Sequence, residues 1–166
     1  MSLEEKLTQF REKYYKENTK ATFFKNSQKL ACAEEITKTF SIEELLFKSI
    51  SIENNKIIIN YPLIKTFINP TIYPNILQHV EYLTNIILSS YEIFEIHLNI
   101  QSFTMTAAQR YNELIKDFCY KYLNSDYEKK LHHIYIQNPP GIITLLQSMF
   151  YPFISESAKT KVIILK

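Results

Sequence analysis

The stretch from Asp126 to Lys166 most constrains the fold, because two apolar runs of strand length flank a helical pattern. The first run, Leu131 to Ile136, ends at Asn138-Pro139-Pro140-Gly141, a turn-forming sequence that is typical after a buried strand. From Ile142 to Phe153, apolar residues recur every three or four positions, which predicts one face of a helix. Val162 to Leu165 is again strand-like. A strand, helix and strand this closely spaced predict a right-handed crossover between parallel strands.

Earlier residues supply the pattern for the rest of such a sheet. Strand-like runs lie at Lys56 to Asn60 and Ile93 to Ile100, and helical spacing marks Pro74 to Ser89 and Thr104 to Tyr122. An Asn54-Asn55 pair before the first run is typical of a hairpin turn, although only its second arm has a clear strand pattern. The alternation predicts an α/β domain with a mostly parallel sheet and helices on its faces.

The first 50 residues are predicted to form a helical subregion. Ser2 and Ser41 stand at expected N-cap positions with glutamates in the following turn, and the helical pattern lapses around Asn18 to Thr22. No linker rich in proline, glycine or serine interrupts the chain. We therefore interpret residues 1–166 as one domain, with a helical part at 1–50 and an α/β part at 51–166.

Composition excludes several functional classes. A single glycine in 166 residues leaves no Walker-type loop or dinucleotide fingerprint. A net charge of +2 and a pI of about 8.4 argue against a nucleic-acid partner. Cys32 and Cys119 follow no CxxC spacing, so we expect two buried free thiols in a reducing compartment. With no secretory signal and no apolar run near the roughly 18 residues of a membrane span, the sequence predicts a cytoplasmic protein, peripheral to membranes at most.

Residue types that support catalysis are not arranged for it. No serine lies in a GxSxG motif, and apolar neighbours of Cys119 disfavour a thiolate. The pair His132-His133 resembles a metal site, but adjacent residues on a regular strand point to opposite faces. His79 and His97 have no partner at metal-ligand spacing. We therefore predict no catalytic residue, no metal site, no cofactor and no enzymatic activity.

The apolar stretch that begins at Ile142 carries the clearest candidate site. It contains no lysine or arginine before Lys159, so the helix either packs deeply in the core, the commoner case, or lines an apolar cavity. Flexible methionine and aromatic side chains adapt well to acyl chains. The candidate ligand-binding residues come from this helix and the neighbouring strands: Leu98, Ile100, Phe103, Ile136, Ile142, Leu146, Met149, Phe150 and Phe153.

Lysines surround the same part of the sequence. They would favour an anionic membrane surface or an acidic protein partner, although a solvated rim is the commoner role of such residues. The six residues are Lys121, Lys129, Lys130, Lys159, Lys161 and Lys166.

Five short motifs in the last third suggest a family. They are Tyr127-Glu128-Lys129-Lys130-Leu131, Ile134-Tyr135-Ile136, Asn138-Pro139, Pro152-Phe153-Ile154-Ser155 and Lys161-Val162-Ile163. In this order they resemble the CRAL-TRIO (Sec14-like) lipid-binding family, and their sequences are most similar to its BCH and Rho GTPase-activating-protein branch.

The resemblance spans Lys56 to Lys166 and implies a non-catalytic domain that binds a lipid or another apolar molecule beneath a mobile helical gate. That gate would be Gly141 to Ser157. Family members continue beyond the strand at Lys161 to Lys166 with another helix and strand, so the resemblance implies a C-terminally shortened domain. Asn99 stands where many members have an acidic residue.

Two functions follow as alternatives. The first is binding of a lipid or apolar molecule, or peripheral docking on an anionic membrane. The second, implied by the BCH branch, is a protein-interaction scaffold that docks a small GTPase, its regulator or a second copy of the chain as a homodimer, with no open lipid pocket. An apolar void beneath the predicted gate would favour the first, and a filled interior would favour the second.

Overall fold

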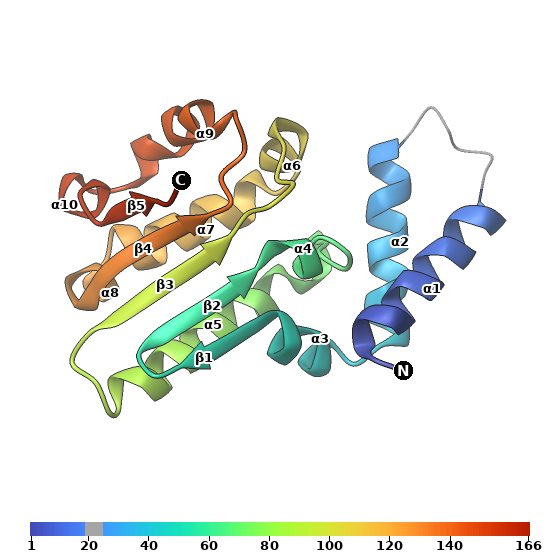
Figure 1. Ribbon diagram of the computed structural model, residues 1–166, viewed down its shortest axis with the longest axis horizontal. Helices are drawn as coiled ribbons and strands as arrows, with labels where there is room; N and C mark the ends of the chain where they lie inside the picture. Colours follow the sequence, from blue (N-terminus) through green and yellow to red (C-terminus); the bar gives the residue numbers. More distant parts are fainter. Residues whose placement is uncertain (19–24) are drawn as a thin grey trace.

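The computed structural model describes residues 1–18 and 25–166 and confirms the α/β class with a mostly parallel sheet (Figure 1). Five strands lie side by side in chain order: β1 (Ile50–Glu53), β2 (Lys56–Asn60), β3 (Phe94–Asn99), β4 (Leu131–Gln137) and β5 (Val162–Ile164). β1 runs antiparallel to β2, and each later pair is parallel. The hairpin suggested by Asn54-Asn55 is present, with Asn54 in the left-handed region at φ 55°.

Helical segments fill each parallel connection. Between β2 and β3 lie α4 (Tyr61–Ile64), the 3-10 turn η2 (Pro70–Ile72) and α5 (Tyr73–Leu88). Between β3 and β4 lie α6 (Met105–Arg110), α7 (Asn112–Leu123) and α8 (Asp126–Lys130). Between β4 and β5 lie α9 (Ile143–Phe150), the 3-10 turn η3 (Tyr151–Phe153) and α10 (Glu156–Lys159). Because the strands follow one another in chain order, crossovers of one hand place their helices on one side of the sheet.

The strands therefore have a covered face and an open face. Ile57, Ile59, Phe94 and Ile96 alternate toward the helices and are buried in the main core. In Figure 1 the opposite face of β2 to β4 is turned toward the viewer, and no described helix lies across it. One row of register partners crosses this open face: Ile58, His97, Tyr135 and Ile163. The sequence predicted helices on the faces of the sheet, and the crossover helices lie on one of them.

The N-terminal helices α1 (Leu3–Glu17), α2 (Lys25–Thr39) and α3 (Ile42–Ser49) lie at one end of the molecule (Figure 1). Ser2 begins α1 with a complete capping box to Glu5, and the Ser41 hydroxyl accepts from the Glu44 N–H at 3.2 Å. The break predicted around Asn18 to Thr22 falls mostly on 19–24, outside the described residues.

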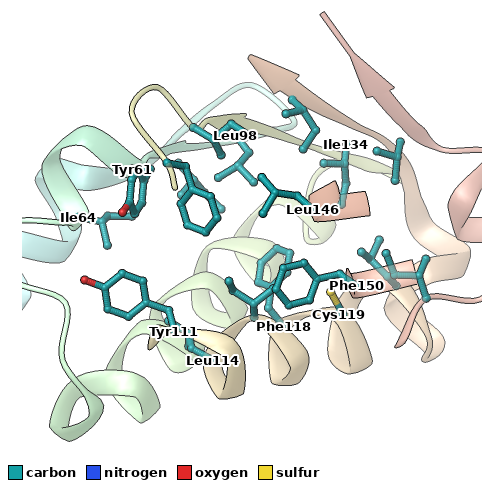
Figure 2. A pocket seen from close by; sticks show the side chains of 18 of the residues that line it. Tyr61, Ile64, Leu98, Tyr111, Leu114, Phe118, Cys119, Ile134, Leu146 and Phe150 are labelled. Carbon is teal, nitrogen blue, oxygen red and sulfur yellow. The ribbon is translucent and has the colours of Figure 1, made fainter. Parts of the chain in front are cut away.

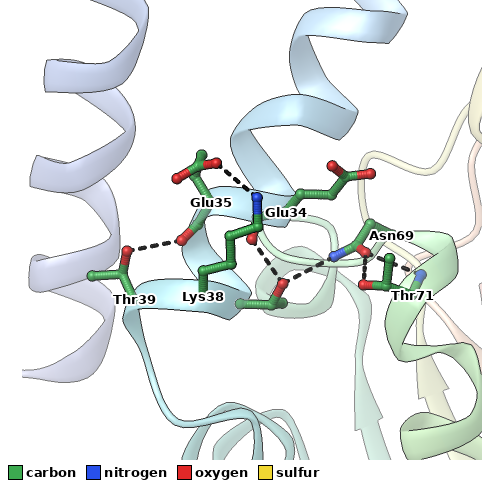
Figure 3. Close-up of polar contacts among 7 residues, drawn as sticks. Glu34, Glu35, Lys38, Thr39, Asn69 and Thr71 are labelled. Carbon is green, nitrogen blue, oxygen red and sulfur yellow. Dashed lines mark hydrogen bonds and ion pairs between the residues drawn. The ribbon is translucent and has the colours of Figure 1, made fainter.

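A buried amide connects these helices to the α/β part. Asn69 is fully buried before η2, and its Nδ2 donates to the Phe67 carbonyl at 3.0 Å and to Thr37 Oγ1 of α2 at 3.4 Å (Figure 3). Its Oδ1 accepts from the N–H and the hydroxyl of Thr71. Because an unpaired amide would be costly here, this network fixes α2 against the loop before α5.

Two predicted helices are interrupted. The stretch predicted as one helix from Thr104 to Tyr122 divides at Tyr111, where the backbone leaves the helical region between α6 and α7. The stretch from Ile142 to Phe153 ends as an α-helix at Phe150. Pro152 explains the second ending, since proline lacks the N–H that would continue the helix and its ring clashes with the preceding turn.

A β-bulge lies between β3 and β4 and corrects one expectation. Phe94 pairs with Leu131 and Ile96 pairs with Ile134, so Glu95 alone is opposite both His132 and His133. The extra residue at a bulge interrupts the usual alternation of side chains. The two imidazoles consequently lie together, with their Nδ1 atoms 3.1 Å apart. The expectation that they point to opposite faces is wrong.

Two further predictions concern thiols and membrane spans. Cys32 and Cys119 are both buried and both free, as predicted. Among the described helices, none has the length and apolar character needed to cross a membrane.

Candidate functional site

An apolar cavity of about 260 Å³ lies between the covered face of the sheet and helices α5, α7 and α9 (Figure 2). Its wall is drawn from nearly every element of the α/β part. The lining residues are Ile50, Ile59, Tyr61, Ile64, Ile68, Ile76, Leu77, Val80, Leu98, Ile100, Phe103, Tyr111, Leu114, Ile115, Phe118, Cys119, Leu123, Ile134, Ile136, Ile143, Leu146, Gln147, Phe150, Tyr151, Ile154, Val162 and Ile164.

The strands and α7 form two opposing walls. Alternate residues of β4 and β5 line the cavity, as in Ile134 and Ile136, because side chains alternate along a strand. On the other wall, Leu114 and Phe118 of α7 recur at helical spacing. Figure 2 shows the α7 residues on one side and the strand residues Leu98 and Ile134 on the other. The sheet and α7 thus give the cavity two walls of regular structure.

The third wall, α9, packs in a small cluster of its own. Its buried residues are Leu146 and Phe150, which form a small cluster with Ala108 that is distinct from the main core. Figure 2 shows both side chains between the two opposing walls. Leu145 on the outer side of the helix is 59% exposed. α9 therefore contributes a short helical wall with two buried side chains.

The lining is uncharged. Among the residues that the structure describes, no Asp, Glu, Lys, Arg or His lines the cavity. Burial raises the pKa of the Cys119 thiol to about 12. Burial, with a smaller contribution from Tyr111, likewise raises the pKa of the Tyr61 phenol to about 12. Both groups are therefore neutral near pH 7, and neither a thiolate nor a phenolate faces the interior.

Six of the nine predicted ligand-binding residues line the cavity: Leu98, Ile100, Phe103, Ile136, Leu146 and Phe150. Ile142, Met149 and Phe153 do not line it and pack instead against the small cluster under α9. Phe153 lies beyond the end of α9, where its ring contacts Tyr120 and the ammonium of Lys116. The three- and four-residue spacing predicts Phe153 on the same helix face, but the α-helix ends at Phe150, before Pro152, so that face does not continue to Phe153.

Lining residues from β2, α5, α7 and β5 were not predicted. The helical pattern did identify an apolar face that includes Tyr111, just before α7, and Leu114, Ile115 and Phe118 within it. That pattern gives the direction of the face, but whether the face meets other side chains or an empty space depends on helix packing. The apolar face was the available signal, and it could not distinguish core from cavity wall.

Most of the lysine cluster is paired. Lys121 contacts Glu81 at 2.6 Å and Lys161 contacts Glu128 at 2.9 Å. Lys129 and Lys159 each pair with an acidic residue three positions earlier. Four of the six lysines therefore have an acidic partner, which reduces the positive potential available to an anionic surface.

No protein-family model matches the chain, and no curated protein has a sequence that matches it significantly.

Proposed function

We propose that this protein binds an apolar molecule in the cavity beneath α9 and carries out no chemistry on it. The observation that carries the proposal is the cavity itself, which measures about 260 Å³ and is lined without a charged group among the described residues. For comparison, an apolar cavity of about 150 Å³ takes up benzene. The volume suits one acyl chain or a compact ring system better than a phospholipid with two chains.

The apolar lining supports an occupant. The space is partly open to solvent, so without a ligand its apolar side chains are in contact with water, which is unfavourable. An apolar ligand covers these side chains, so binding and folding stability should rise together.

The cavity supports the first of the two functions suggested by the sequence. A scaffold with a collapsed interior is disfavoured by a void beneath α9, and membrane docking through the lysines is disfavoured because four of them are ion-paired. The CRAL-TRIO resemblance implies the same arrangement, a helix over an apolar site. The proposal depends on the cavity and would stand without the resemblance.

A single tryptophan provides the test, since the natural chain has none. Ile115→Trp adds bulk to the cavity wall on α7, whereas Tyr120→Trp places the same side chain on the same helix at a position 51% exposed and outside the lining. With a dansyl-labelled fatty acid as probe, we expect Tyr120→Trp to bind like the wild type and Ile115→Trp to bind at least tenfold more weakly. Thermal unfolding of both variants checks that each is folded.

Native mass spectrometry of protein purified from its host complements the probe. A mass above that of the bare polypeptide, lost on acid denaturation, would support a resident apolar ligand. Equal probe affinity in the wild type and both variants, together with a bare polypeptide mass, would overturn the proposal.

A further inference from the structure

The β-bulge gathers three metal-ligating side chains on the open face of the sheet. Glu95 of β3 is opposite His132 and His133 of β4, and one ligand atom from each lies within 4.8 Å of the others. We propose that these three residues form a binding site for one divalent transition-metal ion of the zinc class. The site is independent of the proposed apolar ligand, because none of the three residues lines the cavity.

The spacing of the ligand atoms fits a single ion. His132 Nδ1 lies 3.1 Å from His133 Nδ1 and 3.5 Å from Glu95 Oε2. Two ligands of a tetrahedral zinc ion, each about 2.0–2.1 Å from the metal, lie about 3.3 Å apart. The ligand atoms of Glu95 and His133 lie within 4.8 Å of each other, so one ion can contact all three side chains once these two rotate toward it.

Proton positions favour the same interpretation. Two ring nitrogens at 3.1 Å form a hydrogen bond only if one of them carries a proton that the other accepts. A metal ion bound by both Nδ1 atoms needs both of them unprotonated, so the donor ring changes to the tautomer that carries its single proton on Nε2. Each neutral ring then keeps one proton, and the two Nδ1 atoms already lie close enough together to bind one ion.

His97 provides a second, independent observation. Its Nε2 atom is buried, has no hydrogen-bond partner among the described residues, and lies 3.5 Å from Glu95 Oε1. When Glu95 binds a metal through Oε2, its other oxygen can accept a hydrogen bond from this nitrogen after a small movement. Partners of this kind orient a ligating carboxylate and strengthen metal binding, so we assign His97 as a positioning residue.

Exposure and ligand type define the ion. The Glu95 side chain is only 14% exposed, whereas the His132 side chain is 51% exposed, so the site is packed around Glu95 and open to solvent at His132. Three protein ligands then leave a coordination position for water or another small donor. Two imidazoles and one carboxylate suit Zn²⁺, Ni²⁺ or Cu²⁺, while Mg²⁺ and Ca²⁺ prefer sites made of oxygen atoms.

The test is titration of the full, untagged chain with ZnCl₂, followed by calorimetry. We expect one ion per chain. Glu95→Gln, His132→Ala and His133→Ala should each weaken Zn²⁺ binding by more than the roughly 10–100-fold typical of an outer partner, and His97→Gln should fall within that range. Glu92→Gln is the matched control, because Glu92 is an exposed carboxylate three residues before Glu95 and outside the cluster.

Co²⁺ gives a readout that needs no variant. A site with two nitrogen ligands and few waters should give the intense visible bands of low-coordinate Co²⁺, and Zn²⁺ should remove them. Zn²⁺ affinity that is the same in the wild type and in His132→Ala would overturn the proposal, as would a Co²⁺ spectrum like that of the free aqueous ion. Circular dichroism in EDTA shows that each variant is folded.

Discussion

One sheet presents two faces with opposite chemistry. Toward the helices, Ile96 is buried in the main core, and Leu98 farther along the same strand lines an uncharged cavity. Toward solvent, the adjacent residues Glu95 and His97 belong to a polar cluster with His132 and His133. Because strand side chains alternate, two sites with no shared side chain can be built from the same strands. Core packing and the proposed metal binding therefore use different residues of the same strand: along β3, Ile96 packs in the core while Glu95 and His97 point to the open face.

The two faces also differ in how they are held. Burial of apolar side chains stabilises the covered face, and an ion pair stabilises the edge of the sheet at β5. Lys161, just before β5, contacts Glu128 Oε1 at 2.9 Å, and the Ser157 hydroxyl donates to the same oxygen at 3.0 Å. The open face depends on the backbone ladder and the bulge. Substitutions on the two faces should therefore have effects of different size and kind.

The largest expected effect separates two adjacent residues of β3. Ile96 is fully buried, so Ile96→Ala should lower the free energy of unfolding by about 2–5 kcal/mol. His97→Ala on the open face should change it by less than about 1 kcal/mol, since the ring makes no completed hydrogen bond at Nε2. Urea unfolding of both variants measures the contrast. Equal losses would mean that the open face is covered by something in solution.

A smaller effect concerns the ion pair at the β5 edge. Glu128→Gln should cost about 1.5–3 kcal/mol at neutral pH, because it removes a charge-assisted hydrogen bond from a side chain only 12% exposed. Unfolding measured at several pH values checks both the size and the pH dependence of this loss.

The direction of the pH effect follows from the pKa of Glu128. The hydrogen bond from Lys161 lowers this pKa below the usual value of 4.5. The stability that the pair contributes is therefore complete above the unfolded-state pKa and is lost as pH falls through the folded-state pKa. The difference between the wild type and Glu128→Gln should shrink in acid, and a difference that stays constant would contradict this assignment.

A third prediction tests the turn that leads from β4 to α9. Asn138 has φ 51°, and its Nδ2 donates to Asn99 Oδ1 at 3.0 Å. Asn138→Ala should lower the free energy of unfolding by about 1 kcal/mol, because an alanine is disfavoured in the left-handed region. Gly141→Ala, three residues later, should raise it by about 0.4–1 kcal/mol, since no atom lies within 4 Å of the added Cβ and the φ is not positive. Thermal unfolding that shows the same sign for both would contradict the turn geometry.

The smallest expected effect is coupling between the two faces. Saturating Zn²⁺ should change the affinity for the dansyl-labelled fatty acid by less than about twofold, which corresponds to ~0.4 kcal/mol of coupling. The reason is that the two proposed sites share no side chain. A larger change would show that β3 and β4 transmit strain between the faces, and the reciprocal measurement must give the same factor.

Local patterns predicted much of this fold. The run Lys56 to Asn60 became β2 with the same bounds, because consecutive β-branched residues strongly favour a strand. Ser2 and Ser41 begin helices α1 and α3, because a hydroxyl can accept from the free N–H groups of a first turn. Each of these features depends on residues a few positions apart, which a single sequence shows directly.

The features that were missed depend on residues far apart in the chain. The bulge arises from the register between β3 and β4, and nothing in the two adjacent histidines indicates which residue of β3 will be opposite them. The ion pairs of Lys121 and Lys161 connect residues 40 and 33 positions apart. The cavity was predicted only in part, because an apolar helix face has the same sequence pattern whether it meets side chains or an empty space.

The bulge also has a genetic consequence. Leu131 and Ile134 both face the core, although three positions separate them and a regular strand would place them on opposite faces. An in-frame deletion of one histidine codon would leave Leu131, one histidine and Ile134 in ordinary alternation. Leu131 and Ile134 would still face the helices, and the proposed metal site would lose one of its two imidazoles. A change of one codon is therefore enough to gain or lose the proposed metal site without moving Leu131 and Ile134 off the covered face.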